Sequence, residues 1–132
     1  MKRLLDTNAY GALRRGDDTI ADVVRNSSQL VFSMVVYGEL LFGFRHGNRY
    51  QKNLEELEDF LSQPSIALQE VTRTTADRFG RIAADLRRAG TPIPTNDIWI
   101  AAQAMETGAE LVTFDRHFDN IRGLPILVLK QT

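Results

Sequence analysis

The amino-acid sequence predicts an α/β fold, a three-layer α/β/α sandwich in which helices cover both faces of a parallel sheet. Short apolar runs alternate with longer segments of helical periodicity along the 132 residues, and strands separated by helices form parallel sheets. A composition of 43% hydrophobic and 25% charged residues is typical of a globular protein. Since no repeat, linker or low-complexity tract interrupts this pattern, we expect one domain, residues 1–132.

Each expected element follows from one apolar run or one periodic segment. The expected strands are residues 3–5, 30–32, 66–68, 111–113 and 126–129. The expected helices are residues 9–15, 19–26, 34–44, 48–62, 72–89 and 98–107. Ser33 is a good N-cap for the third helix, and Pro64 stops the fourth. Gly90 and Gly108 close the last two helices.

The composition excludes several kinds of site. Sixteen basic residues against seventeen acidic ones give a net charge of −1, so the bulk charge does not indicate a nucleic-acid partner. The lack of cysteine excludes disulfides, thiolate metal sites and cysteine nucleophiles. Two histidines leave little room for a histidine-rich zinc site. No apolar stretch is long enough for a signal peptide or a membrane span, so we expect a cytoplasmic protein.

Four acidic residues lie where a solvated helix face does not explain them. Asp6 and Asp115 each follow a predicted strand, and ligands of open parallel sheets bind outside the carboxyl ends of the strands. Asp97 precedes an almost wholly apolar helix. Glu39 is the one charged residue between Ser33 and Phe44, and an unpaired carboxylate buried there would cost several kcal/mol.

Each of these acids also has a purely structural interpretation. Asp6 and Asp97 could cap the helices that follow them, and Asp115 could form a turn. Glu39 could lie at the surface or pair with Arg45. Taken together, however, the four carboxylates can fall on one edge of a doubly wound sheet, where they cannot all be ionised without a cation. All-oxygen ligation with no thiolate selects magnesium or manganese.

Four short segments each contain one of these acids, and they follow one another along the whole chain. They are residues 4–8, 33–40, 94–102 and 111–118. Together they resemble a PIN-domain ribonuclease of the VapC type, the toxin of a type II toxin–antitoxin pair. The resemblance implies a five-stranded parallel sheet and four acids that ligate Mg²⁺ (or Mn²⁺), namely Asp6, Glu39, Asp97 and Asp115. It also implies that Thr7, Asn8 and Thr113 orient carboxylates or metal-bound water.

The resemblance implies an RNA substrate, a homodimer and a cognate antitoxin protein that blocks the site. The expected reaction is hydrolysis of an RNA phosphodiester by a water that the cation activates, which leaves products with a 5′-phosphate. Basic side chains near the acids are candidates for substrate binding, although each could equally be a solvated surface charge. These candidates are Arg45, His46, Arg49 and Arg116, with Lys52 and His117 beside them.

Other interpretations of the same residues remain open. A metal-free ribonuclease could use His46 and His117 as acid and base, but it leaves Glu39 unexplained. A phosphatase could use Asp6 as nucleophile, although Asn8 stands where a second aspartate is usual. The domain could also be a catalytically inactive PIN-like module that binds an antitoxin or RNA, or an RNA-processing nuclease without an antitoxin.

Overall fold

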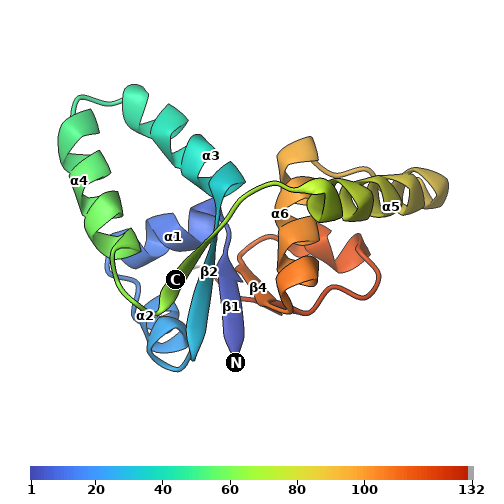
Figure 1. The fold of residues 1–132 in the computed structure, drawn as a ribbon, viewed down its shortest axis with the longest axis horizontal. Helices are drawn as coiled ribbons and strands as arrows, with labels where there is room; N and C mark the ends of the chain where they lie inside the picture. The colour runs from blue at the N-terminus through green and yellow to red at the C-terminus, as the bar shows by residue number, and fades with distance from the viewer. Residues whose placement is uncertain (131–132) are drawn as a thin grey trace.

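The computed structural model describes residues 1–130, in which the predicted parallel sheet lies between two layers of helices (Figure 1). All five strands are parallel, and their order across the sheet is β3-β2-β1-β4-β5. The strands are β1 Lys2–Leu5, β2 Gln29–Ser33, β3 Ile66–Gln69, β4 Glu110–Thr113 and β5 Ile126–Val128. The helices are α1 Thr7–Arg14, α2 Asp18–Arg25, α3 Met34–Arg45, α4 Tyr50–Leu61, α5 Arg73–Ala89 and α6 Thr95–Thr107, with a 3₁₀ helix, η1, at Arg116–Asn120.

The central strands are buried on both faces because helices lie on either side of them. Figure 1 views the sheet nearly edge on, with α1, α2, α3 and α4 on one side and α5 and α6 on the other. Successive side chains of β1 point to opposite faces: Leu4 belongs to the larger core cluster, and Leu5 to a smaller one under α1 and α2. Leu111 and Val112 of β4 divide between the two clusters in the same way. This two-sided burial explains why each strand contains two consecutive buried apolar residues.

Two helices begin two or more residues earlier than the sequence predicts, and both differences affect the site. α1 begins at Thr7 because the Asp6 side chain accepts the Ala9 N–H and so caps the helix at that point. α6 begins at Thr95, three residues before its predicted start. The Pro94 carbonyl already accepts the N–H groups of Asp97 and Ile98, so Asp97 lies within the first turn.

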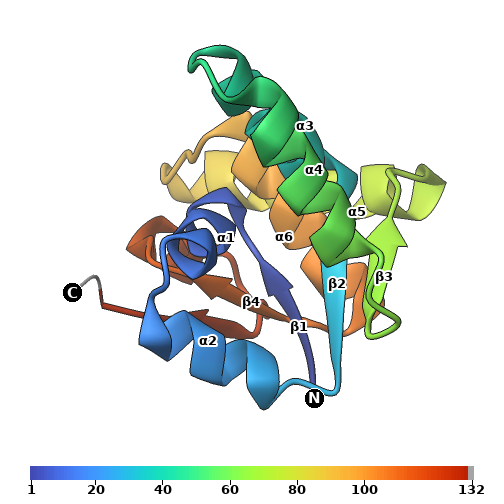
Figure 2. The ribbon, with the colours of Figure 1, turned by 90° about the vertical axis from the view of Figure 1, so that its left-hand side faces the viewer.

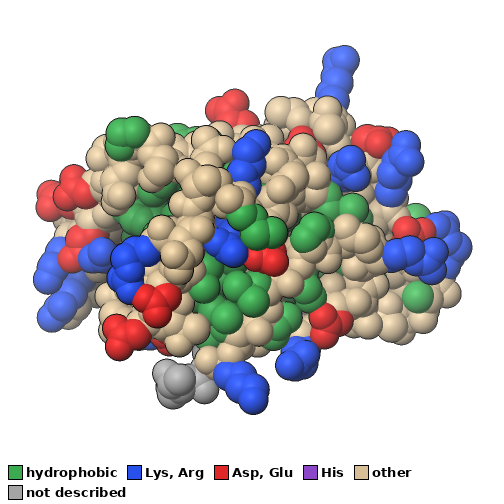
Figure 3. Space-filling view, turned by 90° about the horizontal axis from the view of Figure 1, so that it is seen from below, with side chains coloured by type: hydrophobic (Ala, Val, Ile, Leu, Met, Phe, Trp, Pro, Cys, Tyr) green, Lys and Arg blue, Asp and Glu red, His purple; other side chains and the backbone are tan. Residues whose placement is uncertain are grey.

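Neither acidic nor basic side chains dominate the side of the molecule shown in Figure 3. This view from below Figure 1 looks at the amino ends of the strands, where acidic and basic side chains are interspersed around a patch of hydrophobic ones. None of the helices within residues 1–130 combines the length and the apolar character needed to cross a membrane. Figure 2 shows the opposite edge of the sheet, where α1 and α3 lie above the carboxyl ends of the strands.

Candidate active site

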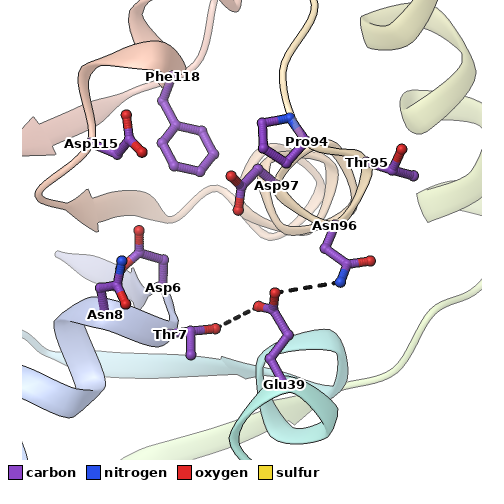
Figure 4. A pocket seen from close by; sticks show the side chains of 10 residues that line it. All are labelled: Asp6, Thr7, Asn8, Glu39, Pro94, Thr95, Asn96, Asp97, Asp115 and Phe118. Carbon is purple, nitrogen blue, oxygen red and sulfur yellow. Dashed lines mark hydrogen bonds between the residues drawn. The ribbon is translucent and has the colours of Figure 1, made fainter. Parts of the chain in front are cut away.

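A cleft of about 480 Å³ opens at the carboxyl edge of the sheet, between the starts of α1 and α6 and the middle of α3 (Figure 4). Its lining residues are Asp6, Thr7, Asn8, Glu39, Pro94, Thr95, Asn96, Asp97, Asp115 and Phe118. All four acids singled out in the sequence line this one cleft, although they come from segments distant along the chain. The parallel sheet explains this convergence, because the carboxyl ends of its strands meet at one edge.

Asp6 is the most buried of the four acids, with 6% of its surface exposed. One carboxylate oxygen accepts the Ala9 N–H at 2.9 Å, and the other accepts the Thr113 hydroxyl at 2.5 Å. Burial raises the pKa of Asp6, and the neighbouring charges of Asp97 and Asp115 raise it further, while the two hydrogen bonds oppose the shift. Asp6 therefore caps α1, as its structural interpretation holds, and also faces the cleft.

Glu39 is half-buried and lines the open cleft, so the buried position suggested by its apolar neighbours is wrong. The Thr7 hydroxyl donates to Oε1 at 2.5 Å, and the Asn96 amide donates to Oε2 at 3.4 Å (Figure 4). Arg45 does not pair with Glu39. The Arg45 guanidinium lies 4.1 Å over the centre of the Tyr50 ring and donates to the Tyr50 hydroxyl.

His117 lies between Asp97 and Asp115 and connects η1 to α6. Its Nε2 atom is 2.8 Å from Asp97 Oδ2, and its Nδ1 atom is 2.9 Å from Asp115 Oδ1. Burial raises the pKa of Asp97, and the charges of Glu39 and Asp115 add to that rise, while His117 opposes it. No side chain caps α6 by a hydrogen bond, although Asp97 does lie in its first turn, where the helix dipole favours an acid. Asp115 does form the predicted turn, since it accepts the His117 N–H at the start of η1.

The predicted supporting residues and the predicted substrate-binding residues differ in their placement. Thr7, Asn8 and the fully buried Thr113 lie at the cleft or directly behind it. The four basic candidates are not among the described residues that line the cleft: Arg45, His46, Arg49 and Arg116. His46 Nδ1 lies 3.0 Å from the Phe42 carbonyl oxygen. With His46 outside the cleft, the geometry does not favour an acid–base pair of two histidines.

Two features of the cleft were missed in the sequence, namely the contact of Asn96 with Glu39 and the bridging position of His117. Asn96 is adjacent to Asp97 in sequence, but its partner Glu39 is 57 residues away. The sequence suggests His117 for substrate binding or acid–base catalysis and does not indicate that it links Asp97 and Asp115. Neither contact leaves a signal in the local sequence, because each depends on how separate elements pack.

The raised pKa values predict how stability depends on pH in the absence of divalent ions. The pKa values of Asp6 and Asp97 are higher in the folded state than in the unfolded state. At a pH between the unfolded-state and folded-state pKa values, the folded protein therefore binds more protons than the unfolded protein. The free energy of unfolding should therefore gain a contribution as pH falls through the raised pKa values, and lose it as pH rises. Asp97→Asn should raise the melting temperature at neutral pH and flatten this dependence.

The measurement is thermal unfolding in chelator from pH 4 to pH 7.5, with Asp59→Asn as the matched control because Asp59 lies exposed on α4. If Asp97→Asn leaves the melting temperature at neutral pH unchanged, or lowers it, the cleft carboxylates do not destabilise one another.

A sandwich of this topology, with carboxylates from four segments gathered at the carboxyl edge of its sheet, defines a nuclease-like acidic site. The chain belongs to the PIN domain family, whose sequence model matches residues 3–124. Ribonuclease VapC2 of Haemophilus influenzae is 32% identical over 127 residues, which cover 94% of this chain and 95% of the relative. The tRNA(fMet)-specific endonuclease VapC of Salmonella typhimurium is 30% identical, with 96% of each chain covered.

Solved structures agree with these relatives. VapBC2 from Rickettsia felis, bound to a DNA fragment from its promoter, superposes with a TM-score of 0.85 at 25% identity, covering 97% of this chain and 98% of that one. DNA-bound VapBC from Salmonella typhimurium gives 0.84 at 28% identity with the same coverage. The predicted fold and the resemblance to VapC-type PIN domains are thus confirmed, and the chain is a nuclease that hydrolyses phosphodiester bonds.

Proposed function

We propose that this protein is the endoribonuclease toxin of a type II toxin–antitoxin pair, and that it cleaves RNA with the help of Mg²⁺ or Mn²⁺ bound in the acidic cleft. The observation that carries the proposal is the gathering of Asp6, Glu39, Asp97 and Asp115 in one cleft. The RNA substrate is supported by relatives named as a ribonuclease and as a tRNA(fMet)-specific endonuclease.

The donor set of the cleft fits a hard divalent cation. Its carboxylates are oxygen ligands and the chain has no thiolate. Burial raises the pKa values of Asp6 and Asp97, and the charge of the neighbouring acids, which adds to that rise, is what a cation relieves. Within residues 1–130, no three Asp, Glu or His side chains are placed closely enough to hold one ion, so ligation requires the carboxylates to turn towards one another. When bound, the cation would neutralise charge on the phosphate and lower the pKa of the attacking water.

The chain's own residues hold and orient the acidic groups. Thr113 donates to Asp6 from β4, and Thr7 donates to Glu39 from the first turn of α1. Each hydroxyl occupies one oxygen of its carboxylate and so fixes the direction of the group. Asn8 lies exposed at the same end of α1, where its amide can reach a substrate or a water in the cleft. His117 ties the positions of Asp97 and Asp115 to each other.

The proposed partner is a cognate antitoxin protein that blocks the cleft, in keeping with neighbours solved as VapBC complexes. A homodimer and a cytoplasmic location stay predictions. We also propose that residues 1–132 form one domain, of which the last two residues lie outside the described part of the chain.

The test of the proposed reaction is the chemistry of the RNA ends. Purified protein incubated with an RNA oligonucleotide and Mn²⁺ should yield fragments with a 5′-phosphate, because a water rather than the ribose 2′-hydroxyl attacks phosphorus. Chelator should stop the reaction, and added Mn²⁺ should restore it. Chelator-resistant cleavage that leaves a 5′-hydroxyl would contradict the proposal and revive a metal-free mechanism.

A further inference from the structure

The segment that follows Glu39 combines positive charge with aromatic rings and contains no acid. Residues 40–54 form the second half of α3, the connection to α4 and the first turns of α4. In a chain whose net charge is −1, this segment has no Asp or Glu. It contains Arg45, Arg49 and Lys52 together with His46, Phe42, Phe44 and Tyr50. Basic residues interleaved with aromatic ones are typical of surfaces that bind single-stranded nucleic acid.

Phe42 and His46 extend from Glu39 along one face of α3. The three residues are spaced i, i+3 and i+7, which places them on one helical stripe. With a rise of about 1.5 Å per residue, Phe42 lies about 4.5 Å and His46 about 10.5 Å along the axis from Glu39. The stripe therefore starts at a cleft carboxylate and leads away from the cleft towards the end of the helix.

Phe42 is 70% exposed, more than any other large hydrophobic side chain in the described part of the chain. Its ring centre lies 4.5 Å from that of His46 in an edge-to-face arrangement, and His46 Nδ1 lies 3.0 Å from the Phe42 carbonyl oxygen. Tyr50 differs, because the Arg45 guanidinium covers its ring. Phe42 thus presents an uncovered aromatic ring that His46 holds in place. We call Phe42 and His46 together the ledge.

We propose that the ledge stacks an unpaired base of the RNA next to the cleaved phosphodiester, while Arg49 and Lys52 contact its backbone phosphates. Arg49 and Lys52 are exposed, and their charge complements phosphate. Stacking requires a base that is splayed out, so the substrate at this position is single-stranded rather than duplex RNA. This inference rests on the proposed function, which places the cleavage at the neighbouring Glu39.

The test measures binding to the full-length chain carrying Asp97→Asn, which keeps the RNA uncut. The probes are a fluorescein-labelled unstructured RNA oligonucleotide and the same oligonucleotide annealed to its complement, with binding followed by anisotropy. Phe42→Ala should weaken single-strand binding by roughly 5- to 150-fold, the loss found when one stacking side chain is removed. Phe42→Trp should restore it, and duplex binding should not change. The control is Leu68→Ala, a 53% exposed hydrophobic residue on β3.

Charge contacts have a separate signature in the same assay. Loss of one phosphate contact through Arg49→Ala or Lys52→Ala should lower the slope of log affinity against log salt by about 0.7 for a single strand. Phe42→Ala should leave that slope unchanged, because stacking releases no counterions.

Equal single-strand affinity with and without the Phe42 ring would overturn the ledge, and so would a loss that affects the duplex to the same extent. If Phe42→Ala leaves RNA affinity unchanged and weakens only the binding of an antitoxin peptide, the surface belongs to the protein partner instead. The proposed function is judged separately, by cleavage of the same oligonucleotide by wild type. If wild type cleaves the RNA but Phe42→Ala does not weaken RNA binding, only the proposal for the ledge is contradicted. If Phe42→Ala weakens RNA binding but wild type does not cleave, the proposed function is contradicted.

Discussion

The Glu39→Gln variant should lose RNA cleavage by about 10²- to 10³-fold, the scale of loss when one preorganised electrostatic group is removed from an active site. Glutamine keeps an oxygen that can accept the Thr7 hydroxyl but removes the negative charge that a cation needs. Because Glu39 is only half-buried, the exchange should leave the fold intact. The measurement is cleavage of an RNA oligonucleotide in vitro, together with growth arrest and mapped RNA ends after induced expression in cells.

The control for this experiment is Glu55→Gln, which removes the same charge from an exposed position on α4. Wild type and the control should both arrest growth, and Glu39→Gln should not. Growth arrest by all three proteins would remove Glu39 from the mechanism. If none of them arrests growth or cuts RNA, the protein is a binding module rather than a toxin.

Asp97→Asn should reduce both cation binding and RNA cleavage, with cleavage falling by about 10³-fold. Asp97 lies between the other acids: it contributes to the raised pKa of Asp6, and Glu39 and Asp115 contribute to its own. Removal of the Asp97 charge should therefore weaken cation binding more than removal of a carboxylate at the edge of the cleft. Each tenfold loss of rate corresponds to about 1.4 kcal/mol of activation barrier. Thermal unfolding should show a stable variant, so the loss is not one of folding.

The Asp97 result is decided by comparing cleavage rates at saturating Mn²⁺. Full activity of Asp97→Asn would show that the cleft works without this carboxylate. A variant that recovers activity only at higher Mn²⁺ concentration would still agree with a ligand role, because the remaining carboxylates can bind a cation more weakly.

The central strands could be predicted from the sequence because burial on both faces requires consecutive apolar residues. Leu4 and Leu5 pack into different core clusters on the two faces of the sheet, so both must be apolar. Ser33 was equally informative, since its hydroxyl accepts the N–H groups of Val35 and Val36 as an N-cap does. The start of α6 was harder to predict, because its N-cap residue is Pro94. The Pro94 carbonyl accepts the first hydrogen bonds of the helix, but proline has no side chain that can cap it.

The acids of the site could be singled out by position, but their environments could not. Asp6 both caps α1 and faces the cleft, so the two interpretations of its sequence position were never exclusive. The apolar neighbours of Glu39 suggested burial, whereas that face of α3 is open and Phe42 is largely exposed. The bridge from His117 to Asp97 and Asp115 depends on how η1 packs against α6, and no local pattern encodes it.

The central claim is that the carboxylates meeting at the carboxyl edge of the sheet share a divalent cation. Calorimetric titration of Mn²⁺ into chelator-treated protein measures this directly, with Asp97→Asn and Glu55→Gln titrated alongside. We expect saturable binding by wild type and by Glu55→Gln, a rise in melting temperature that grows with Mn²⁺ concentration, and much weaker binding by Asp97→Asn. Wild-type protein that takes up no Mn²⁺ or Mg²⁺, or an Asp97→Asn variant that binds as tightly as wild type, would contradict the claim.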